Sequence, residues 1–173
     1  MTFSDESNAL QFRVVLDRRL ADLALFSLEV YNNSQWGVDF DASQLACQDT
    51  IRNTTCRPLD RSAFDRKLDE LIAVNIGVSG YYRVMASVSS DDCNSYGNYY
   101  AWLSSIYTAM PAAYQCDKEK YSHKILDNAR LLPGERYNAT YVISSSCLRH
   151  MKDIRLIYNG PKEPKGKPGE MKN

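Results

Sequence analysis

The chain has 173 residues, a length that suits one large domain or two small ones with a buried core. Its 21 basic and 21 acidic residues give a formal net charge of zero and are interspersed along most of the chain, so nucleic acid is not an expected partner. No apolar run reaches the roughly 20 residues that a bilayer crossing requires, and we expect no direct membrane insertion here.

Two interpretations of residues 10–31 are open. Three leucines fall at helical spacing, namely Leu16, Leu20 and Leu23, whereas alternation typical of a strand runs through Phe26, Leu28 and Val30. We favour two strands that flank Asp17-Arg18-Arg19.

A short helix is expected to follow residue 60. Four apolar side chains line one face of it, Phe64, Leu68, Leu71 and Ile72, and Asp60 or Ser62 is suited to cap its start. After this helix, Gly80–Val88 alternates and is rich in β-formers, which predicts a strand.

From residue 89 to the last residue, the sequence predicts a loop, two strands and a linker. Residues 89–116 are loop-like at both ends and strongly aromatic. Segments 136–145 and 152–160 look like two antiparallel strands joined by a turn around Leu148 to Lys152. Residues 161–173 are rich in Pro, Gly and Lys with almost no apolar side chain, as in a flexible linker or stalk.

Five cysteines without a C-x-x-C pair fit neither a zinc site nor a thioredoxin-type motif. We therefore expect disulfides and an oxidising, extracellular or secretory compartment, with five reduced thiols in a cytosolic protein as the alternative. Of the three connectivities that four cysteines allow, we predict Cys47–Cys56 and Cys93–Cys116. Cys147 is then left over, either paired with a partner chain, buried as a thiol, or exchanged with one of the other four.

Three triplets have the form of N-glycosylation acceptors, beginning at Asn32, Asn53 and Asn138. Alone this is a weak signal, because about one or two such triplets are expected by chance in a chain of this composition. Together with the cysteines, the triplets favour a glycoprotein.

The stretch from Leu131 to Tyr137 is the most specific local motif. A Tyr at the start of a sandwich strand can turn its hydroxyl back onto the preceding chain, and Pro133-Gly134 would supply the turn while Leu131 packs beneath the ring. The pattern resembles the L-x-P-G-x-x-Y corner of fibronectin type III domains. The alternative is an unrelated loop followed by a strand.

A wider resemblance covers roughly residues 78–160. Asp127–Leu131 leading into Tyr137, and Gly80–Val84 followed by an acidic turn and Cys93, resemble segments of the single-span uroplakins and of membrane-proximal fibronectin-like ectodomains. The resemblance implies a type I membrane ectodomain whose partner is another membrane protein, such as a tetraspanin, packed into a surface array as a homo- or hetero-oligomer.

A candidate interface lies in the aromatic stretch, because Tyr and Trp are typical interface anchors. Its residues are Tyr96, Tyr99, Tyr100, Trp102 and Tyr107. The alternative is that these rings fill a small core beneath a disulfide-closed loop.

Signals of catalysis are few. The chain has only two histidines, His123 and His150, outside any metal-ligand spacing, and Gly77–Gly80 lacks the form of a nucleophile elbow. We expect no catalytic residue, metal or cofactor.

The sequence thus predicts a mainly β, immunoglobulin- or fibronectin III-like sandwich with one short helix. Its parts would be an α/β or β segment at 1–76, the sandwich at 77–160, and the linker at 161–173. The expected function is that of a non-catalytic, structural or adhesive ectodomain that binds another membrane protein. The alternatives are a ligand-binding receptor ectodomain that uses the 96–114 surface, and a secreted enzyme or enzyme inhibitor.

Overall fold

The computed structural model describes residues 2–4, 9–89, 96–149 and 154–160. The chain divides into two compact units. The first comprises Met1–Asp60 and Ile125–Asn173, and the second is Arg61–Lys124. The second unit is therefore an insertion between two segments that fold together.

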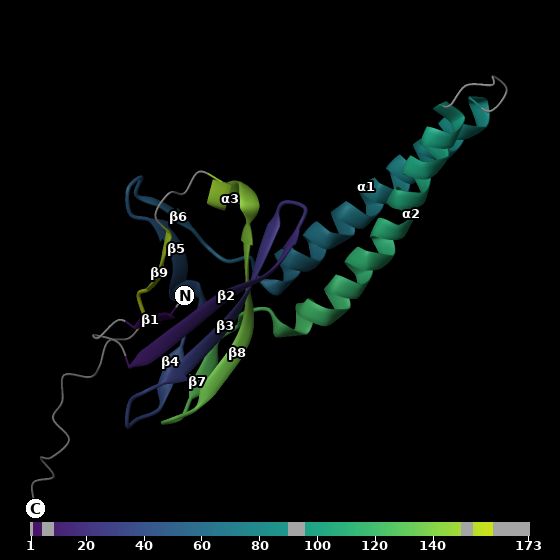
Figure 1. Cartoon of the computed structure of the whole chain (residues 1–173). Helices are drawn as coiled ribbons and strands as arrows, with labels where there is room; N and C mark the ends of the chain where they lie inside the picture. The colour runs from purple at the N-terminus through teal and green to yellow at the C-terminus, as the bar shows by residue number, and fades with distance from the viewer. Residues whose placement is uncertain (1, 5–8, 90–95, 150–153, 161–173) are drawn as a thin grey trace, which may run out of the picture. The chain divides into compact units, whose positions relative to one another are not determined.

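The largest sheet of the first unit has four antiparallel strands, β1 (Thr2–Ser4), β2 (Leu10–Leu20), β3 (Leu23–Asn32) and β8 (Arg136–Ser144), in the order β1-β2-β3-β8 (Figure 1). Burial alternates along the second half of β3, where Leu28, Val30 and Asn32 are buried. This alternation is the pattern that predicted a strand, and the two strands expected within 10–31 are confirmed.

The turn between β2 and β3 lies four residues later than the sequence suggested. It is formed by Ala21 and Asp22, and Ala21 has a left-handed φ of 47°. Asp17 lies instead at an irregularity of β2, where the register shifts between Leu16 and Arg18.

Two smaller antiparallel sheets complete the first unit. One pairs β4 (Val38–Phe40) with β7 (Ala129–Leu131), and the other has β5 (Leu45–Asp49) between β6 (Thr54–Cys56) and β9 (Ile154–Tyr158). The short helices are η1 (Ala42–Gln44) and α3 (Ser145–Arg149).

All three sheets contribute to one hydrophobic core. The rings of Phe12, Phe40 and Tyr158 come from different sheets, and the Tyr158 centroid lies 5.3 Å from each of the other two. Such ring pairs add about 0.5–1.5 kcal/mol each beyond the area they bury. The core therefore joins segments from both ends of the chain.

The second unit is a helical hairpin of α1 (Arg61–Val88) and α2 (Tyr96–Tyr121), followed by η2 (Ser122–Lys124) (Figure 1). The two long helices run antiparallel, since Asp69 near the start of α1 contacts Lys118 near the end of α2. The helix expected after residue 60 is confirmed, but it is longer than predicted.

The prediction of a mainly β, immunoglobulin- or fibronectin III-like sandwich is wrong. The predicted strand Gly80–Val88 is the end of α1, and the aromatic stretch expected as a loop is most of α2. The strand predicted within 152–160 exists as β9, but it pairs with β5 and not with β8.

The predicted domain boundaries also change. The boundary between 76 and 77 lies inside α1, and the sandwich region 77–160 combines half of the hairpin with strands of the first unit. The predicted linker, residues 161–173, lies outside the described residues.

One helix in the described part of the chain, α1, is long and apolar enough to cross a membrane by length and composition, and only 11% of its most apolar window is buried. The search for an unbroken apolar run missed it because Asn75, Ser79 and Tyr81 interrupt the run.

Candidate functional site

The middle of the contact between α1 and α2 contains polar side chains. Ser79 and Thr108 share a hydrogen bond between their hydroxyl oxygens at 2.6 Å, and the Ser104 hydroxyl donates to the Ser79 carbonyl at 3.3 Å. Ser79 and Ser104 are buried, as is Asn75 one turn before Ser79. We call Ser79, Ser104 and Thr108 the seam. Each buried hydroxyl of the seam has a partner, which offsets the cost of burying it.

Charged side chains gather at one end of the hairpin. The Lys118 ammonium contacts the Asp69 carboxylate at 2.7 Å, and the Ser122 hydroxyl donates to Asp65 at 2.9 Å. The first turns of α1 and the last turns of α2 hold most of the charge of this unit. Arg83 is the only charged residue from 71 to 88, and residues 96–116 have none.

The outward face of the hairpin carries large apolar side chains. Eight of them are more than half exposed: Val74, Ile76, Tyr81, Val84, Val88, Tyr96, Tyr99 and Trp102. A water-exposed helix pair usually buries its apolar residues against its partner and exposes the polar ones. Along the middle of this hairpin the side chains of Asn75, Ser79 and Ser104 are buried, whereas these eight apolar side chains are exposed.

Aromatic rings from both helices form a cluster near the α1–α2 connection. Tyr82 of α1 stacks on Tyr100 and Tyr107 of α2, at centroid distances of 6.1 and 5.5 Å. The rings of Tyr81, Tyr99 and Trp102 extend the cluster. These six residues are the aromatic cluster.

The predicted interface residues divide between two environments. Tyr96, Tyr99 and Trp102 are exposed by 59, 52 and 58%, whereas Tyr100 and Tyr107 are half-buried against Tyr82. The exposed position of the first three is the one that the interface prediction requires. The packing of the other two is the one that the alternative, a small aromatic core, requires. The disulfide-closed loop of that alternative is replaced by a helix.

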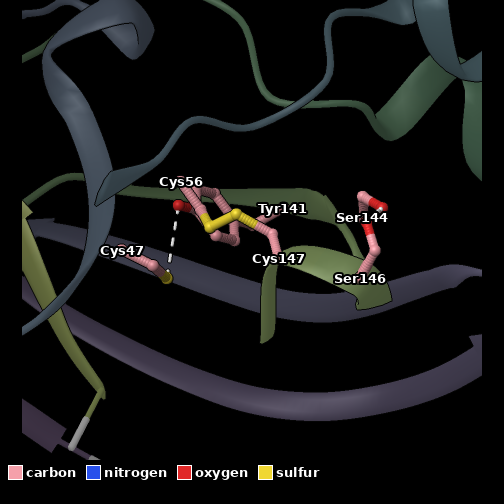
Figure 2. The surroundings of a disulfide bond; sticks show 6 residues. All are labelled: Cys47, Cys56, Tyr141, Ser144, Ser146 and Cys147. Atoms are coloured by element: carbon pink, nitrogen blue, oxygen red, sulfur yellow. Dashed lines mark hydrogen bonds between the residues drawn. A yellow bond between two sulfur atoms is a disulfide. The ribbon is translucent and has the colours of Figure 1, made fainter. Parts of the chain in front are cut away.

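A disulfide joins Cys56 of β6 to Cys147 of α3 (Figure 2). The two residues are 91 positions apart, and the whole hairpin lies between them in sequence. This bridge ties the segment before the insertion to the segment after it. It is the kind of bond that persists in an oxidising compartment.

Cys47 is a buried free thiol beside this disulfide. The Tyr141 hydroxyl donates to its sulfur at 3.4 Å (Figure 2). Burial raises the pKa of the Cys47 thiol and of the Tyr141 hydroxyl, because both charged forms lose their hydration. The Cys47 thiol is therefore inert rather than nucleophilic.

The predicted cysteine pairing is wrong for three residues. Cys47 and Cys56 face each other in the β5–β6 register, yet Cys56 bonds Cys147 and Cys47 stays a thiol. Cys147, expected to be left over, is paired. Cys116 is an exposed free thiol on α2, and its predicted partner Cys93 lies outside the described residues.

The three sequons differ in accessibility. Asn53 and Asn138 are exposed, at a turn and on β8. Asn32 is fully buried, and its Nδ2, the atom that would carry a glycan, donates to the carbonyls of Trp36 and Leu131 at 2.8 and 3.0 Å. The prediction of a glycan at Asn32 conflicts with this geometry.

The local geometry expected around Tyr137 is present without the sandwich. Its hydroxyl accepts from the Asp127 amide at 3.1 Å, and Leu131 is buried. Glu135 donates its amide to the Leu132 carbonyl at 3.0 Å, which closes a turn over Pro133-Gly134 with Gly134 at φ 75°. These are the positions that a type II turn gives to Pro and Gly.

The remaining polar residues give no sign of a reaction centre in the described ranges. No group of three or more His, Cys, Asp and Glu residues there could hold a metal ion. His123 is exposed on η2 with its Nδ1 3.1 Å from the Glu119 carbonyl, and His150 lies outside these ranges.

Comparisons of the chain with protein-family models, curated proteins and solved structures give no match. The resemblance to uroplakins and fibronectin-like ectodomains therefore stays a prediction.

Sequence reasoning missed the hairpin itself. The signal was available as two segments almost free of charge, 71–88 and 96–116, each bounded by a charged cluster. Within 71–88, the polar residues Asn75 and Ser79 recur at helical spacing.

Proposed function

We propose that this chain is a non-catalytic, N-glycosylated ectodomain of the cell surface or secretory pathway. Its role is structural or adhesive, and it binds another membrane protein through the helical hairpin. The Cys56–Cys147 disulfide and the exposed sequons at Asn53 and Asn138 support the compartment.

The exposed part of the aromatic cluster carries the proposal of binding. Tyr81, Tyr99 and Trp102 expose more than half of their surface within one unit. Large, rigid aromatic side chains supply contact area at a low entropy cost, which is why they recur as anchors of interfaces. Neighbouring rings hold them in place, so little ordering remains to be done on binding.

The proposal is compatible with a tetraspanin-like partner, the kind that a uroplakin-like protein would bind. A helix pair with an apolar outer face suits contact with the helices of such a partner. The β unit would then be the part displayed in an array.

Site-specific photo-cross-linking on intact cells tests this function. A photoreactive amino acid replaces Tyr99 in one variant and Gln115, an exposed polar residue of the same helix, in the matched control. Irradiation should give a discrete protein adduct from the membrane fraction at position 99 and none at 115. The same replacement is made at Tyr96 and Trp102, which are also exposed. If positions 96, 99 and 102 all fail to capture a protein, the proposed binding role is wrong.

A further inference from the structure

The two apolar segments of the hairpin lie at the same level along its axis. Ser79 pairs with Thr108 in the middle, and Asp69 pairs with Lys118 at the charged end. In this antiparallel register, residues 71–88 of α1 lie opposite residues 96–116 of α2. The hairpin therefore has one continuous zone that is almost free of charge.

The length of this zone matches a lipid bilayer. At 1.5 Å per residue, 71–88 spans ~27 Å and 96–116 spans ~31 Å. The hydrocarbon core of a typical bilayer is about 30 Å thick. The charged turns that precede residue 71 and follow residue 116 then both lie at the level of the headgroups on one side of the bilayer.

The inside-out distribution of polarity is the one that lipid favours. Helices in lipid gain nothing from burying apolar side chains against each other, so small and hydroxyl residues gather at their contact and hydrogen-bond across it. The seam has this composition, and its hydroxyl groups are bonded across the two helices or to the preceding turn. A core helix that is apolar and buried is excluded as an explanation, because 11% of the apolar window of α1 is buried.

Three further details agree with a bilayer. Five of the six residues of the aromatic cluster lie in the half of the apolar zone nearer the α1–α2 connection, the side on which an aromatic belt at a membrane interface would lie. Gly77, Gly80 and Pro111 lie inside the helices, where they are costly in water but common in membrane helices. Arg83, the one charged residue of the zone, donates its guanidinium to the Thr108 hydroxyl at 3.5 Å, so its charge is partnered within the hairpin, as charged residues of membrane helices are.

The geometry points to insertion of the helical hairpin into the hydrocarbon core of a lipid bilayer. The charged ends of α1 and α2 lie at one interface and the aromatic cluster lies toward the other. Lipid covers the exposed aliphatic side chains, Val74, Ile76, Val84 and Val88, and the exposed rings of the aromatic cluster stay available to a protein partner within the membrane. This replaces the expectation that these residues do not enter a membrane. The contact with lipid is separate from the contact with a protein partner and needs no partner to form.

Trp102 gives a direct readout of this contact. The chain has two tryptophans, so Trp36→Phe leaves Trp102, 58% exposed, as the single reporter. The full chain is reconstituted with phosphatidylcholine vesicles whose acyl chains carry bromine near the headgroup or near the chain end. Insertion predicts a blue shift of the emission, protection from acrylamide, and quenching by bromine at both depths, because Trp102 lies six residues, ~9 Å, inside the end of the apolar zone.

Matched variants separate insertion from surface adsorption. Ile76→Glu places a charge in the middle of the apolar zone, at a side chain that is 59% exposed, and should lower partitioning into vesicles at least tenfold. Gln35→Glu adds the same charge to an exposed position of the first unit and should leave partitioning unchanged. Circular dichroism checks that both variants keep their helix content.

Three outcomes overturn the inference. These are Trp102 unquenched by either lipid, quenching by shallow bromine alone, and equal partitioning of Ile76→Glu and Gln35→Glu. A chain that dimerises in buffer and shields Trp102 from acrylamide without lipid would instead assign the face to a second copy. None of these results depends on the cross-link to a protein partner, so the two proposals fail separately.

Discussion

The side-chain amide of Asn32 donates to two backbone carbonyls and accepts from Ser34 through the backbone amide at 2.9 Å and the hydroxyl at 2.6 Å. Asn32 is the last residue of β3, Trp36 lies just before β4, and Leu131 is the last residue of β7, so these bonds hold the three strands together. A glycan on Nδ2 would leave that nitrogen a single N–H for the Trp36 and Leu131 carbonyls, and would place a sugar in the buried core. Molecules that fold to this structure therefore carry no glycan there.

We expect two glycans on the folded, secreted chain, at Asn53 and Asn138. Asn53→Gln and Asn138→Gln should each remove one glycan from the mass, since both side chains are exposed. Asn32→Gln should leave the glycan mass unchanged. Intact mass before and after glycosidase treatment measures this, and a glycan lost on Asn32→Gln would contradict the buried amide.

The turn before β8 gives a second test at this scale. Gly134 has φ 75° and open space where a Cβ would be, so Gly134→Ala adds backbone strain without a clash. It should lower the free energy of unfolding by about 1 kcal/mol, as for an L residue in the left-handed region. The control is Gly37→Ala, whose Cβ would make only ordinary contacts at 3.7 Å. Urea unfolding compares the two, and equal losses would refute the turn geometry.

At the scale of elements, the Cys56–Cys147 disulfide fastens β6 to α3 across 91 residues. In the chain-entropy model a disulfide that closes a loop of this length stabilises the folded state by about 4–5 kcal/mol, because it lowers the entropy of the unfolded chain. Cys47 lies in the same group of side chains, where its buried thiol accepts from the Tyr141 hydroxyl (Figure 2).

Replacing both bonded cysteines should therefore have a large effect. Cys56→Ser with Cys147→Ser is expected to lower the free energy of unfolding by about 3–5 kcal/mol. Cys116→Ser, which changes an exposed free thiol, should stay within about 0.5 kcal/mol of the parent. Denaturant titrations decide between this bridge and the predicted pair Cys47–Cys56: if Cys47→Ser were as damaging as the double variant, the assigned bridge would be wrong.

The strands were more predictable than the helices, for a physical reason. Leu28 and Val30 alternate with exposed residues, because one face of β3 packs on the core. The Leu131–Tyr137 motif likewise predicted its own turn and hydroxyl contact, because both are set by residues close in sequence. Neither pattern depends on how the sheets are arranged. The prediction of a β-sandwich from the Leu131–Tyr137 motif was therefore wrong.

The hairpin escaped prediction because its polarity is inverted. A search for apolar residues at helical spacing fails where the buried positions are Asn75 and Ser79 and the exposed positions are Val74 and Ile76. Tyr82, Val84 and Val88 then look like an alternating strand. The candidate site could be located as an aromatic stretch, but its display on two helices depends on contacts 25 or more residues apart.

At the scale of the whole molecule, the chain segments just before and just after the helical hairpin both hydrogen-bond to the same strand, β8. The Leu59 amide donates to the Val142 carbonyl, and the Leu126 amide donates to the Thr140 carbonyl, at 2.8 and 3.0 Å. Both ends of the insertion are therefore fixed to β8, two residues apart, without help from the helices.

Removing the hairpin should leave the first unit folded. Replacing residues 61–124 with a short Gly/Ser linker is expected to keep the Cys56–Cys147 bridge and a cooperative unfolding transition, because the core lies within the first unit. The same change should abolish binding to vesicles. Loss of the native bridge in the shortened chain would show that the units are not independent.

An antiparallel hairpin whose polar seam joins α1 to α2 underlies both proposals. Cross-linking across the seam tests it most directly: Ser79→Cys with Thr108→Cys replaces two hydroxyl groups that are 2.6 Å apart, and Gly77→Cys with Thr108→Cys is the control from the exposed face. Mild oxidation followed by peptide mapping should show a 79–108 disulfide and no 77–108 disulfide. Absence of the 79–108 bridge, or equal formation of both, would contradict the hairpin and the proposals built on it.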